Sequence, residues 1–253
     1  MTMEWPERLW IVRHGQSAGN VARDLASASN EDRIPIGQRD VDVPLSALGE
    51  EQAQALGRWF AQASAEDRPD ILLCSPYKRA RQTAELFRSV GGAPADEPIC
   101  GDERLREKEF GILDGLTVSG IHHLQPDQAE FRRLLGKFYH RPPGGESWCD
   151  VILRLRSLMD TVSLHYAGRR VMIFAHQVVV LCLRTIIENL DEATILAIDR
   201  QGDVANCGVT EYRHVQGDRG GKLELAQYNV TAPVEAVGTP VTREPDRAAG
   251  SRA

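Results

Sequence analysis

The sequence predicts an α/β protein, a three-layer α/β/α sandwich with a mostly parallel central sheet. Two observations carry this prediction. Short apolar runs of strand length alternate along the chain with longer segments whose apolar residues recur every three or four positions. The chain has 253 residues, 42% of them hydrophobic and 26% charged, so it is long enough to enclose one large core. Successive β and α units favour parallel strands with helices on both faces.

The first half of the chain supplies two expected strands, each followed by a helix. Residues 9–12 form the first apolar run, and a helix is expected from Ser46, a good N-cap with carboxylates in the turn that follows. Residues 70–74 form a second short strand. The helix that begins after Ser75 has an apolar inner face.

The second half continues the alternation and ends in a different composition. Ser147 and Asp150 form a capping-box pattern before a helix that extends to Val162. A strand is expected at 170–175, a helix at 178–190, and a closing strand pair at 208–214 and 223–228 around residues 217–221. Residues 231–253 are rich in Pro, Gly, Ala and charge, so we expect a flexible tail there.

The charge and cysteine content narrow the classes of partner. A net charge of -6 argues against nucleic acid or an anionic membrane as the main partner. The five cysteines are scattered without a C-x-x-C pair, which favours reduced thiols over a disulfide framework or zinc site. No signal peptide or membrane-span pattern is present, so we expect a cytoplasmic protein. The adjacent His122 and His123 cannot both face one metal and are expected on the surface. The sequence carries no signal for an oligomeric state.

Polar residues of catalytic types follow three of the expected strands. Arg13-His14-Gly15 ends the first strand, Arg79 lies in the first turn of the helix after 70–74, and His176 follows 170–175. The carboxyl ends of parallel strands meet at one edge, where ligands bind. Cations beside an imidazole at this edge indicate an anion pocket with a nucleophile.

Each of these segments also has an ordinary interpretation. A lone histidine such as His176 is more often a hydrogen-bonded core residue. Lys78 and Arg81 are best interpreted as a solvated basic face. Carboxylates among cations, such as Glu107 and Glu109, are by default exposed ion pairs.

Taken in order, the segments resemble the histidine phosphatase superfamily, also called the phosphoglycerate mutase-like family, from about residue 9 to 210. The matching elements are Arg13-His14-Gly15 with Ser17 and Asn20, Arg79 within Ser75 to Ala84, Glu107 before Phe110-Gly111, and His176. The resemblance implies a histidine phosphatase domain over 1–230 with a cap insertion around 112–146, followed by the tail at 231–253.

The resemblance also implies a mechanism. His14 would attack phosphorus to form a phosphohistidine, with its other ring N–H held by the Gly15 carbonyl. Glu107 would protonate the leaving group and later activate water, with Glu109 as the second choice. The implied phosphate-binding residues are Arg13, Arg79, His176, Asn20, Ser17 and Gln177. No metal or cofactor is implied.

The substrate is less well indicated. Residues 133–139, 141–147 and 175–177 resemble the phosphatase half of bifunctional fructose-2,6-bisphosphate enzymes, in which the residues matching Arg133 and Lys137 grip the distal phosphate. A solvated helix face that includes Arg132 explains the same residues equally well. Leu181 replaces an arginine of that family, and its substrate-binding tyrosine has no counterpart near Leu124. The extra residues 23–38 are expected in the pocket wall, from which one of three arginines could reach substrate: Arg23, Arg33 or Arg39.

The sequence thus predicts a metal-independent phosphoric monoester hydrolase that acts on a small phosphorylated metabolite, a sugar phosphate or a phosphorylated carboxylic acid. One alternative is a phosphoglycerate mutase-type phosphotransferase, which would return the phosphate to a second hydroxyl. The other is a non-catalytic phosphate-binding module that retains the fold.

Overall fold

The computed structural model describes residues 5–217, 220–236 and 238–243, which contain one mixed sheet with strand order β3-β2-β4-β1-β5-β6. Its strands are β1 (Arg8–Arg13), β2 (Ile71–Cys74), β3 (Ile99–Gly101), β4 (Arg170–Ala175), β5 (Val209–Val215) and β6 (Lys222–Val230). The first four are parallel, and β5 and β6 are antiparallel. The prediction of a mostly parallel sheet is confirmed. The expected closing strand pair is β5 and β6, although residues 218–219 of its connection lie outside the described residues.

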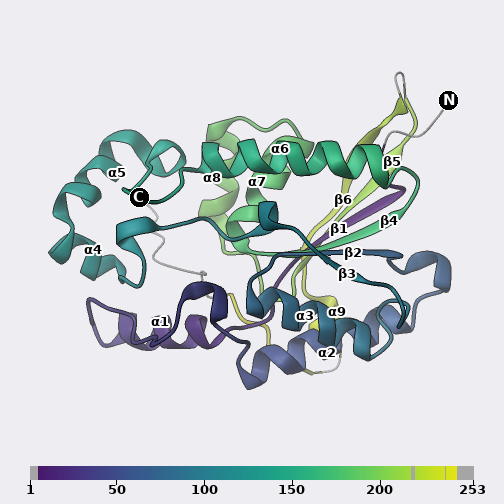
Figure 1. Ribbon diagram of the computed structural model, residues 1–253, viewed down its shortest axis with the longest axis horizontal. Helices are drawn as coiled ribbons and strands as arrows, with labels where there is room; N and C mark the ends of the chain where they lie inside the picture. Colours follow the sequence, from purple (N-terminus) through teal and green to yellow (C-terminus); the bar gives the residue numbers. More distant parts are fainter. Residues whose placement is uncertain (1–4, 218–219, 237, 244–253) are drawn as a thin grey trace.

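Helices cover both faces of the sheet. The helices of the described part are α1 (Ala18–Ala28), α2 (Ala47–Ala61), α3 (Lys78–Ser89), α4 (Val118–Leu124), α5 (Pro126–Tyr139), α6 (Trp148–His165), α7 (Gln177–Ile187), α8 (Glu192–Gln201) and α9 (Ala232–Glu235). Figure 1 shows α6, α7 and α8 on one face and α2, α3 and α9 on the other, with α1, α4 and α5 gathered at one end of the molecule. None of the described helices is long and apolar enough to cross a membrane.

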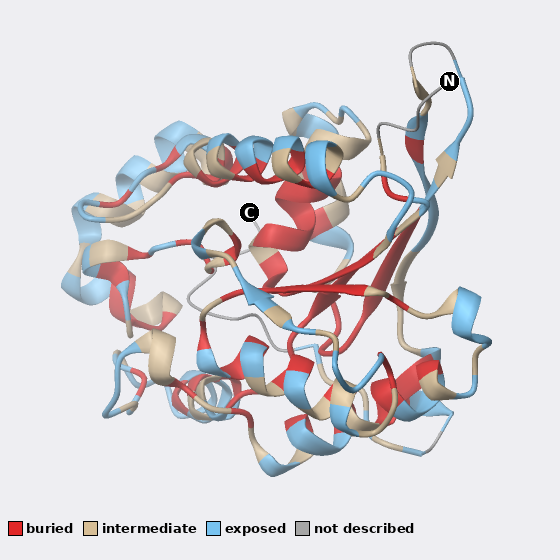
Figure 2. Cartoon of the chain, turned by 45° about the vertical axis from the view of Figure 1, so that its right-hand side comes forward, coloured by how far each residue is buried: buried red, intermediate tan, exposed pale blue. Residues whose placement is uncertain are grey.

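The alternation of side chains along β1 divides the core in two. Leu9 and Ile11 pack with the apolar face of α6, whereas Trp10 and Val12 pack with α2 and α3. This period of two is what a strand between two helical layers requires, because successive side chains point to opposite faces. Figure 2 shows the central strands and the helix faces against them as buried, whereas the edge strands β3 and β6 are largely exposed or intermediate. The three-layer architecture predicted from the sequence is therefore confirmed.

Both serines expected to begin helices do so. The Ser46 hydroxyl accepts a hydrogen bond from the Gly49 N–H (3.1 Å), and Ser147 and Asp150 form the reciprocal capping box of α6. The helix expected at 178–190 ends earlier, at Ile187, because Asn189 adopts a left-handed conformation (φ 51°). The next helix, α8, is capped by Asp191 and was not anticipated.

The expectation of a loose tail from residue 231 is wrong for its described part. Residues 232–235 form α9, and Val234 is fully buried in the core beside α2. Farther on, the Asn206 N–H donates to the Thr242 carbonyl oxygen (2.9 Å), and Gln52 Nε2 donates to the carbonyl oxygen of Pro240 (2.9 Å). The Pro-rich composition did not predict that Val234 would be buried or that backbone carbonyls of this segment would accept hydrogen bonds from the core. Residues 244–253 lie outside the described residues.

Candidate active site

Parallel pairing brings the predicted polar residues to one edge of the sheet. Arg13 is the register partner of Ala175, and the His14 N–H donates to the Ala175 carbonyl oxygen (3.0 Å). On the other side of β4, the Ser75 N–H donates to the Phe174 carbonyl oxygen (2.9 Å). The residues that follow β1, β2 and β4 are consequently neighbours.

The surroundings of His14 define its tautomer. Its Nδ1 lies 2.6 Å from the Gly15 carbonyl oxygen, which can only accept, so Nδ1 carries the proton. Its Nε2 lies 3.2 Å from Nε of Arg79, which can only donate, so Nε2 carries the lone pair. The fully buried imidazole is therefore neutral, and its nucleophilic nitrogen faces a guanidinium.

A second histidine lies beside His14, and a second buried arginine, Arg13, directly precedes it in the chain. Arg13 Nη1 donates to the Val204 carbonyl oxygen, which anchors its guanidinium. The His176 ring lies 5.2 Å from the His14 ring, measured between centroids, and its Nε2 is 2.8 Å from the Ser75 hydroxyl oxygen. Buried guanidiniums beside an imidazole suit a dianion, because charge-assisted hydrogen bonds are strong where water is excluded.

Close backbone packing holds the turn that follows His14. A Cβ on Gly15 would lie 2.4 Å from the Gly49 carbonyl oxygen, and a Cβ on Gly49 would lie 1.9 Å from that of Gln16. The Gly15 N–H donates to the Thr83 hydroxyl (3.1 Å), and the Gln16 N–H donates to Oε1 of Gln52 (2.9 Å). Helices α2 and α3 thus fix the turn directly.

The smaller residues predicted to bind phosphate also begin helices. Ser17 and Asn20 form the capping box of α1, with the Ser17 N–H 2.9 Å from Oδ1 of Asn20. Gln177 is the first residue of α7, and its Nε2 donates to Asp203 (2.7 Å). The N-terminal turns of α1, α3 and α7 begin near the same sheet edge, and helix N-termini favour anions.

Burial separates the two candidate acids. Glu107 is fully buried, and its Oε1 accepts a hydrogen bond from the Lys108 N–H (2.8 Å). The side chain of Glu109 is 47% exposed and accepts a hydrogen bond from the Tyr77 hydroxyl (2.9 Å). Because proton transfer is most effective where water is excluded, the burial favours Glu107.

The cap places different cations inward from those the sequence indicated. Arg133 is 68% exposed and pairs with Glu130, so it lies on the solvent side of α5. Lys137 is half-buried with its ammonium 2.5 Å from Asp199. The two would share a face of a regular helix, but Gly136 interrupts α5 with a φ of 76°. Arg132 is the inward arginine: burial lowers its pKa, and its charge lowers the pKa of Lys108.

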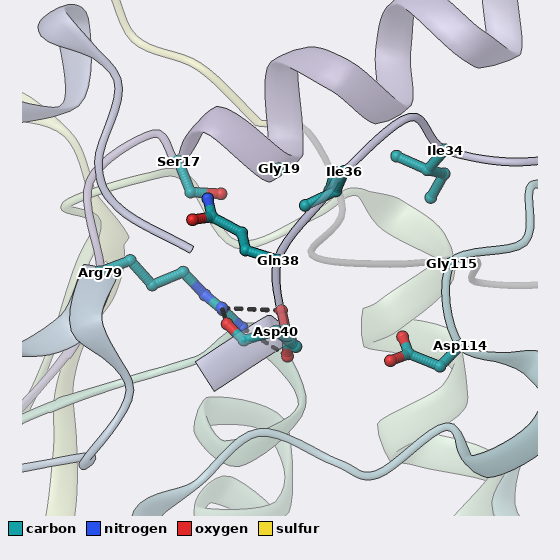
Figure 3. Close-up of a pocket in the computed structure, with 9 residues that line it drawn as sticks. All are labelled: Ser17, Gly19, Ile34, Ile36, Gln38, Asp40, Arg79, Asp114 and Gly115. Atoms are coloured by element: carbon teal, nitrogen blue, oxygen red, sulfur yellow. Dashed lines mark hydrogen bonds and ion pairs between the residues drawn. The ribbon is translucent and has the colours of Figure 1, made fainter. Parts of the chain in front are cut away.

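The extra residues before Asp42 form a wall, as the sequence suggested. A cavity of about 210 Å³ is lined by Ser17, Gly19, Ile34, Ile36, Gln38, Asp40, Arg79, Asp114 and Gly115 (Figure 3). None of the three arginines proposed to reach substrate from this segment lines it. Arg23 is buried in α1 against Asp24, Arg39 is exposed and pairs with Asp42, and Arg33 is exposed.

Sequence reasoning missed two carboxylates at the site. Asp40 pairs with Arg79, and Asp203 accepts a hydrogen bond from Gln177. Neither lies in a recognisable motif: Asp40 begins a 3-10 helix of only three residues, and Asp203 lies in a segment without regular structure. The only available signal for Asp40 was its position next to the extra residues.

The adjacent histidines His122 and His123 are exposed, as expected, and His123 Nδ1 lies 2.8 Å from Oδ1 of Asp32. Across the described ranges, no group of three or more His, Cys, Asp or Glu side chains is arranged to hold a metal ion.

Comparison with known proteins gives one consistent result. The profile of the histidine phosphatase superfamily (branch 1) matches residues 9–228. A probable phosphoglycerate mutase of Serratia proteamaculans is 26% identical over 211 residues, which are 83% of this chain and 86% of that protein. The 6-phosphofructo-2-kinase/fructose-2,6-bisphosphatase of Caenorhabditis elegans is 30% identical over 179 residues, which are 70% of this chain but 33% of that larger protein.

Among solved structures, a mycobacterial glucosyl-3-phosphoglycerate phosphatase with inorganic phosphate superposes with a TM-score of 0.68 at 25% identity, covering 90% of this chain and 100% of that one. The family profile spans most of the chain, and the fold agrees with it. The protein therefore belongs to the histidine phosphatase superfamily, branch 1, which includes phosphatases and mutases.

Proposed function

We propose that the protein hydrolyses small phosphate monoesters through a phosphohistidine on His14. The observation that carries this proposal is the neutral His14 ring, with Nδ1 protonated toward Gly15 and the Nε2 lone pair facing the buried guanidinium of Arg79. Such a ring is ready to attack without first losing a proton.

The reaction has two displacements at phosphorus. The Nε2 lone pair attacks, the bond to the ester oxygen breaks, and this oxygen leaves with the electron pair and takes a proton from Glu107. Water then attacks the phosphohistidine while Glu107 accepts its proton, and the P–N electrons return to Nε2 as inorganic phosphate departs. Arg13, Arg79 and His176 stabilise the phosphoryl oxygens, with Ser17, Asn20 and the amide of Gln177 as further donors.

Two cations, the buried Lys108 beside Glu107 and the half-buried Arg132 of the cap, favour a substrate with a second anionic group. Lys108 follows the acid Glu107 directly and is 6% exposed, and burial together with the charge of Arg132 lowers its pKa to about 8. Within the described residues, neither Lys108 nor Arg132 has an ion-pair or hydrogen-bond partner for its charged group. A desolvated cation without an ion-pair partner in contact is costly, and an anionic substrate would supply one.

This substrate class includes sugar bisphosphates and phosphorylated carboxylic acids. One structural neighbour is named a glucosyl-3-phosphoglycerate phosphatase, and the substrate in that name is a phosphorylated carboxylic acid. Lys137, paired with Asp199, lies in the same part of the cap, whereas Arg133 on the solvent side does not support this role.

Inorganic phosphate release from a panel of esters, with chelator present, tests the reaction. The panel comprises an aryl phosphate, fructose bisphosphates, phosphoglycerates and a phosphotyrosine peptide, assayed with the native chain and His14→Ala. We expect release by the native chain, absent in His14→Ala, with the highest kcat/KM for esters with a second anion. No release from any ester by the native chain would contradict hydrolysis.

The role of Glu107 has its own test. Glu107→Ala should slow alkyl esters by at least about a hundredfold, because alkoxides need protonation, and should spare the aryl ester. Glu109→Ala is the matched control and should affect both esters little. Equal loss on both esters in Glu107→Ala would show that Glu107 is not the proton donor.

A phosphoglycerate mutase activity is the second candidate, favoured by the names of relatives such as that of Serratia proteamaculans. It predicts interconversion of phosphoglycerates that requires a bisphosphorylated primer and releases little phosphate. Primer-independent release of stoichiometric phosphate would exclude it.

A further inference from the structure

Arg79 is held by contacts that the family motifs did not indicate. Its Nη1 donates to both the carbonyl oxygen and Oδ1 of Asp40, each at 2.8 Å. Its Nη2 donates to Oδ2 of the same residue (3.2 Å), and its Nε donates to Nε2 of His14 (3.2 Å). Figure 3 shows the Asp40 carboxylate directed at the end of the Arg79 side chain.

These contacts divide the guanidinium into two edges. The carboxylate takes the end edge, made by the two terminal nitrogens, in the fork geometry that carboxylates and guanidiniums share. The side edge, which carries Nε, is turned toward the nucleophile. The Arg79 side chain is 2% exposed and that of Asp40 is 16% exposed, so solvent screens the pair little.

Another neighbour of the guanidinium, the Tyr77 ring, does not set this orientation. The Tyr77 ring packs 5.0 Å from the Arg79 guanidinium carbon. Stacking of this kind fixes the plane of the guanidinium but leaves rotation within the plane undetermined. A two-point carboxylate contact fixes that rotation, and the third contact, to the Asp40 backbone, ties it to the chain.

We propose that Asp40 is a positioning residue that fixes the in-plane orientation of Arg79, so that its Nε edge meets the phosphoryl group where His14 attacks. This inference rests on the proposed hydrolysis. Misorientation by a fraction of an ångström is expected to slow in-line attack more than it weakens phosphate binding, because binding depends mainly on charge and attack depends on geometry.

The proposal predicts a split between turnover and binding. Asp40→Asn should lower kcat at least tenfold on the aryl phosphate. Inorganic phosphate, measured by titration calorimetry, should bind no more weakly than to the native chain, because Arg79 keeps its charge and a nearby carboxylate charge is lost. The matched control is Asp42→Asn, whose carboxylate pairs with the exposed Arg39, and it should change neither quantity.

A double-mutant cycle tests whether Asp40 acts through Arg79. Arg79→Ala should lower both kcat and phosphate binding, and adding Asp40→Asn to it should cause no further loss of kcat. Additive losses, an unchanged kcat in Asp40→Asn, or a weakened phosphate affinity in that variant would each overturn the proposal.

The two proposals fail in different ways. The hydrolase proposal fails if the native chain releases no phosphate, or if His14→Ala releases phosphate as fast as the native chain. If the native chain is active and Asp40→Asn turns over normally, only the role of Asp40 is refuted. A folding defect would appear as a lower melting temperature of Asp40→Asn, in which case Asp40→Ser, with a smaller side chain and no charge, repeats the measurement.

Discussion

Replacing Lys108 with methionine should stabilise the free protein at neutral pH. The lysine is 6% exposed, and its ammonium lies 4.5 Å from the centre of the Phe110 ring. Burial, reinforced by the charge of Arg132, lowers its pKa from the ordinary 10.5 to about 8. Methionine keeps the apolar stem and removes the charge.

The size of the effect follows from the pKa. A change from 10.5 to about 8 corresponds, at 1.36 kcal/mol for each pKa unit, to about 3 kcal/mol of unfavourable charge burial. The penalty is complete below pH 8, where the folded and unfolded chains are both charged. Between pH 8 and 10.5 the unfolded chain binds more protons, so the free energy of unfolding contributed by Lys108 rises with pH.

Urea unfolding at several pH values measures this contribution. At pH 7, Lys108→Met should exceed the native chain in free energy of unfolding by up to about 3 kcal/mol, and the difference should shrink toward pH 10. Lys222→Met, at a lysine 71% exposed on β6, is the control and should show no such trend. A difference between Lys108→Met and the native chain that is constant from pH 7 to 10 would refute the reasoning.

The other predictions concern packing, the C-terminal segment and the cap. Gly49→Ala should lower the free energy of unfolding by about 1–3 kcal/mol and abolish most of the phosphate release, because its Cβ would overlap backbone atoms. Gly37→Ala, whose Cβ meets nothing within 4 Å, should change neither the unfolding free energy nor the phosphate release. Thr242→Val removes hydrogen bonds to Gln52 and Asn206 and should lower the free energy of unfolding by about 1–3 kcal/mol. Thr239→Val should not lower it, and equal urea midpoints for Thr242→Val and the native chain would contradict the prediction. Arg132→Ala should raise KM for phosphoglycerates but not for the aryl phosphate, while Arg133→Ala should change neither; the reverse pattern would restore the assignment made from the sequence.

The sequence was informative where local rules and topology coincide. The end of an apolar run marked the sheet edge, and parallel pairing then brought Arg13, His14 and His176 together without further information. Serine caps predicted helix starts in the same way, because an N-cap hydrogen bond is made within four residues. Such features depend on short-range geometry or on the edge shared by all parallel strands.

It was less informative where one residue breaks a regular pattern. Helical spacing placed Arg133 beside Lys137, but the left-handed Gly136 between them turned the two side chains to different surroundings. Asp40 pairs with Arg79 from a three-residue 3-10 helix, which is too short for the spacing of apolar residues to predict it. In the C-terminal segment, the burial of Val234 depends on a partner helix that is distant in the sequence.

The hydrogen bonds that support His14 join residues far apart in the sequence, and this has a consequence for how the protein is made. The Asn206 amide donates to the His14 carbonyl oxygen, and Asn206 in turn hydrogen-bonds Thr242. About 230 residues separate His14 from Thr242, and β1 lies between β4 and β5, both synthesised much later. At about 5–20 residues per second, a ribosome needs about 10–50 s to bridge that interval. Throughout it the nascent chain carries an apolar strand without its partners, which exposes it to chaperone binding, and the backbone of His14 gains these contacts only after residue 242 has been synthesised.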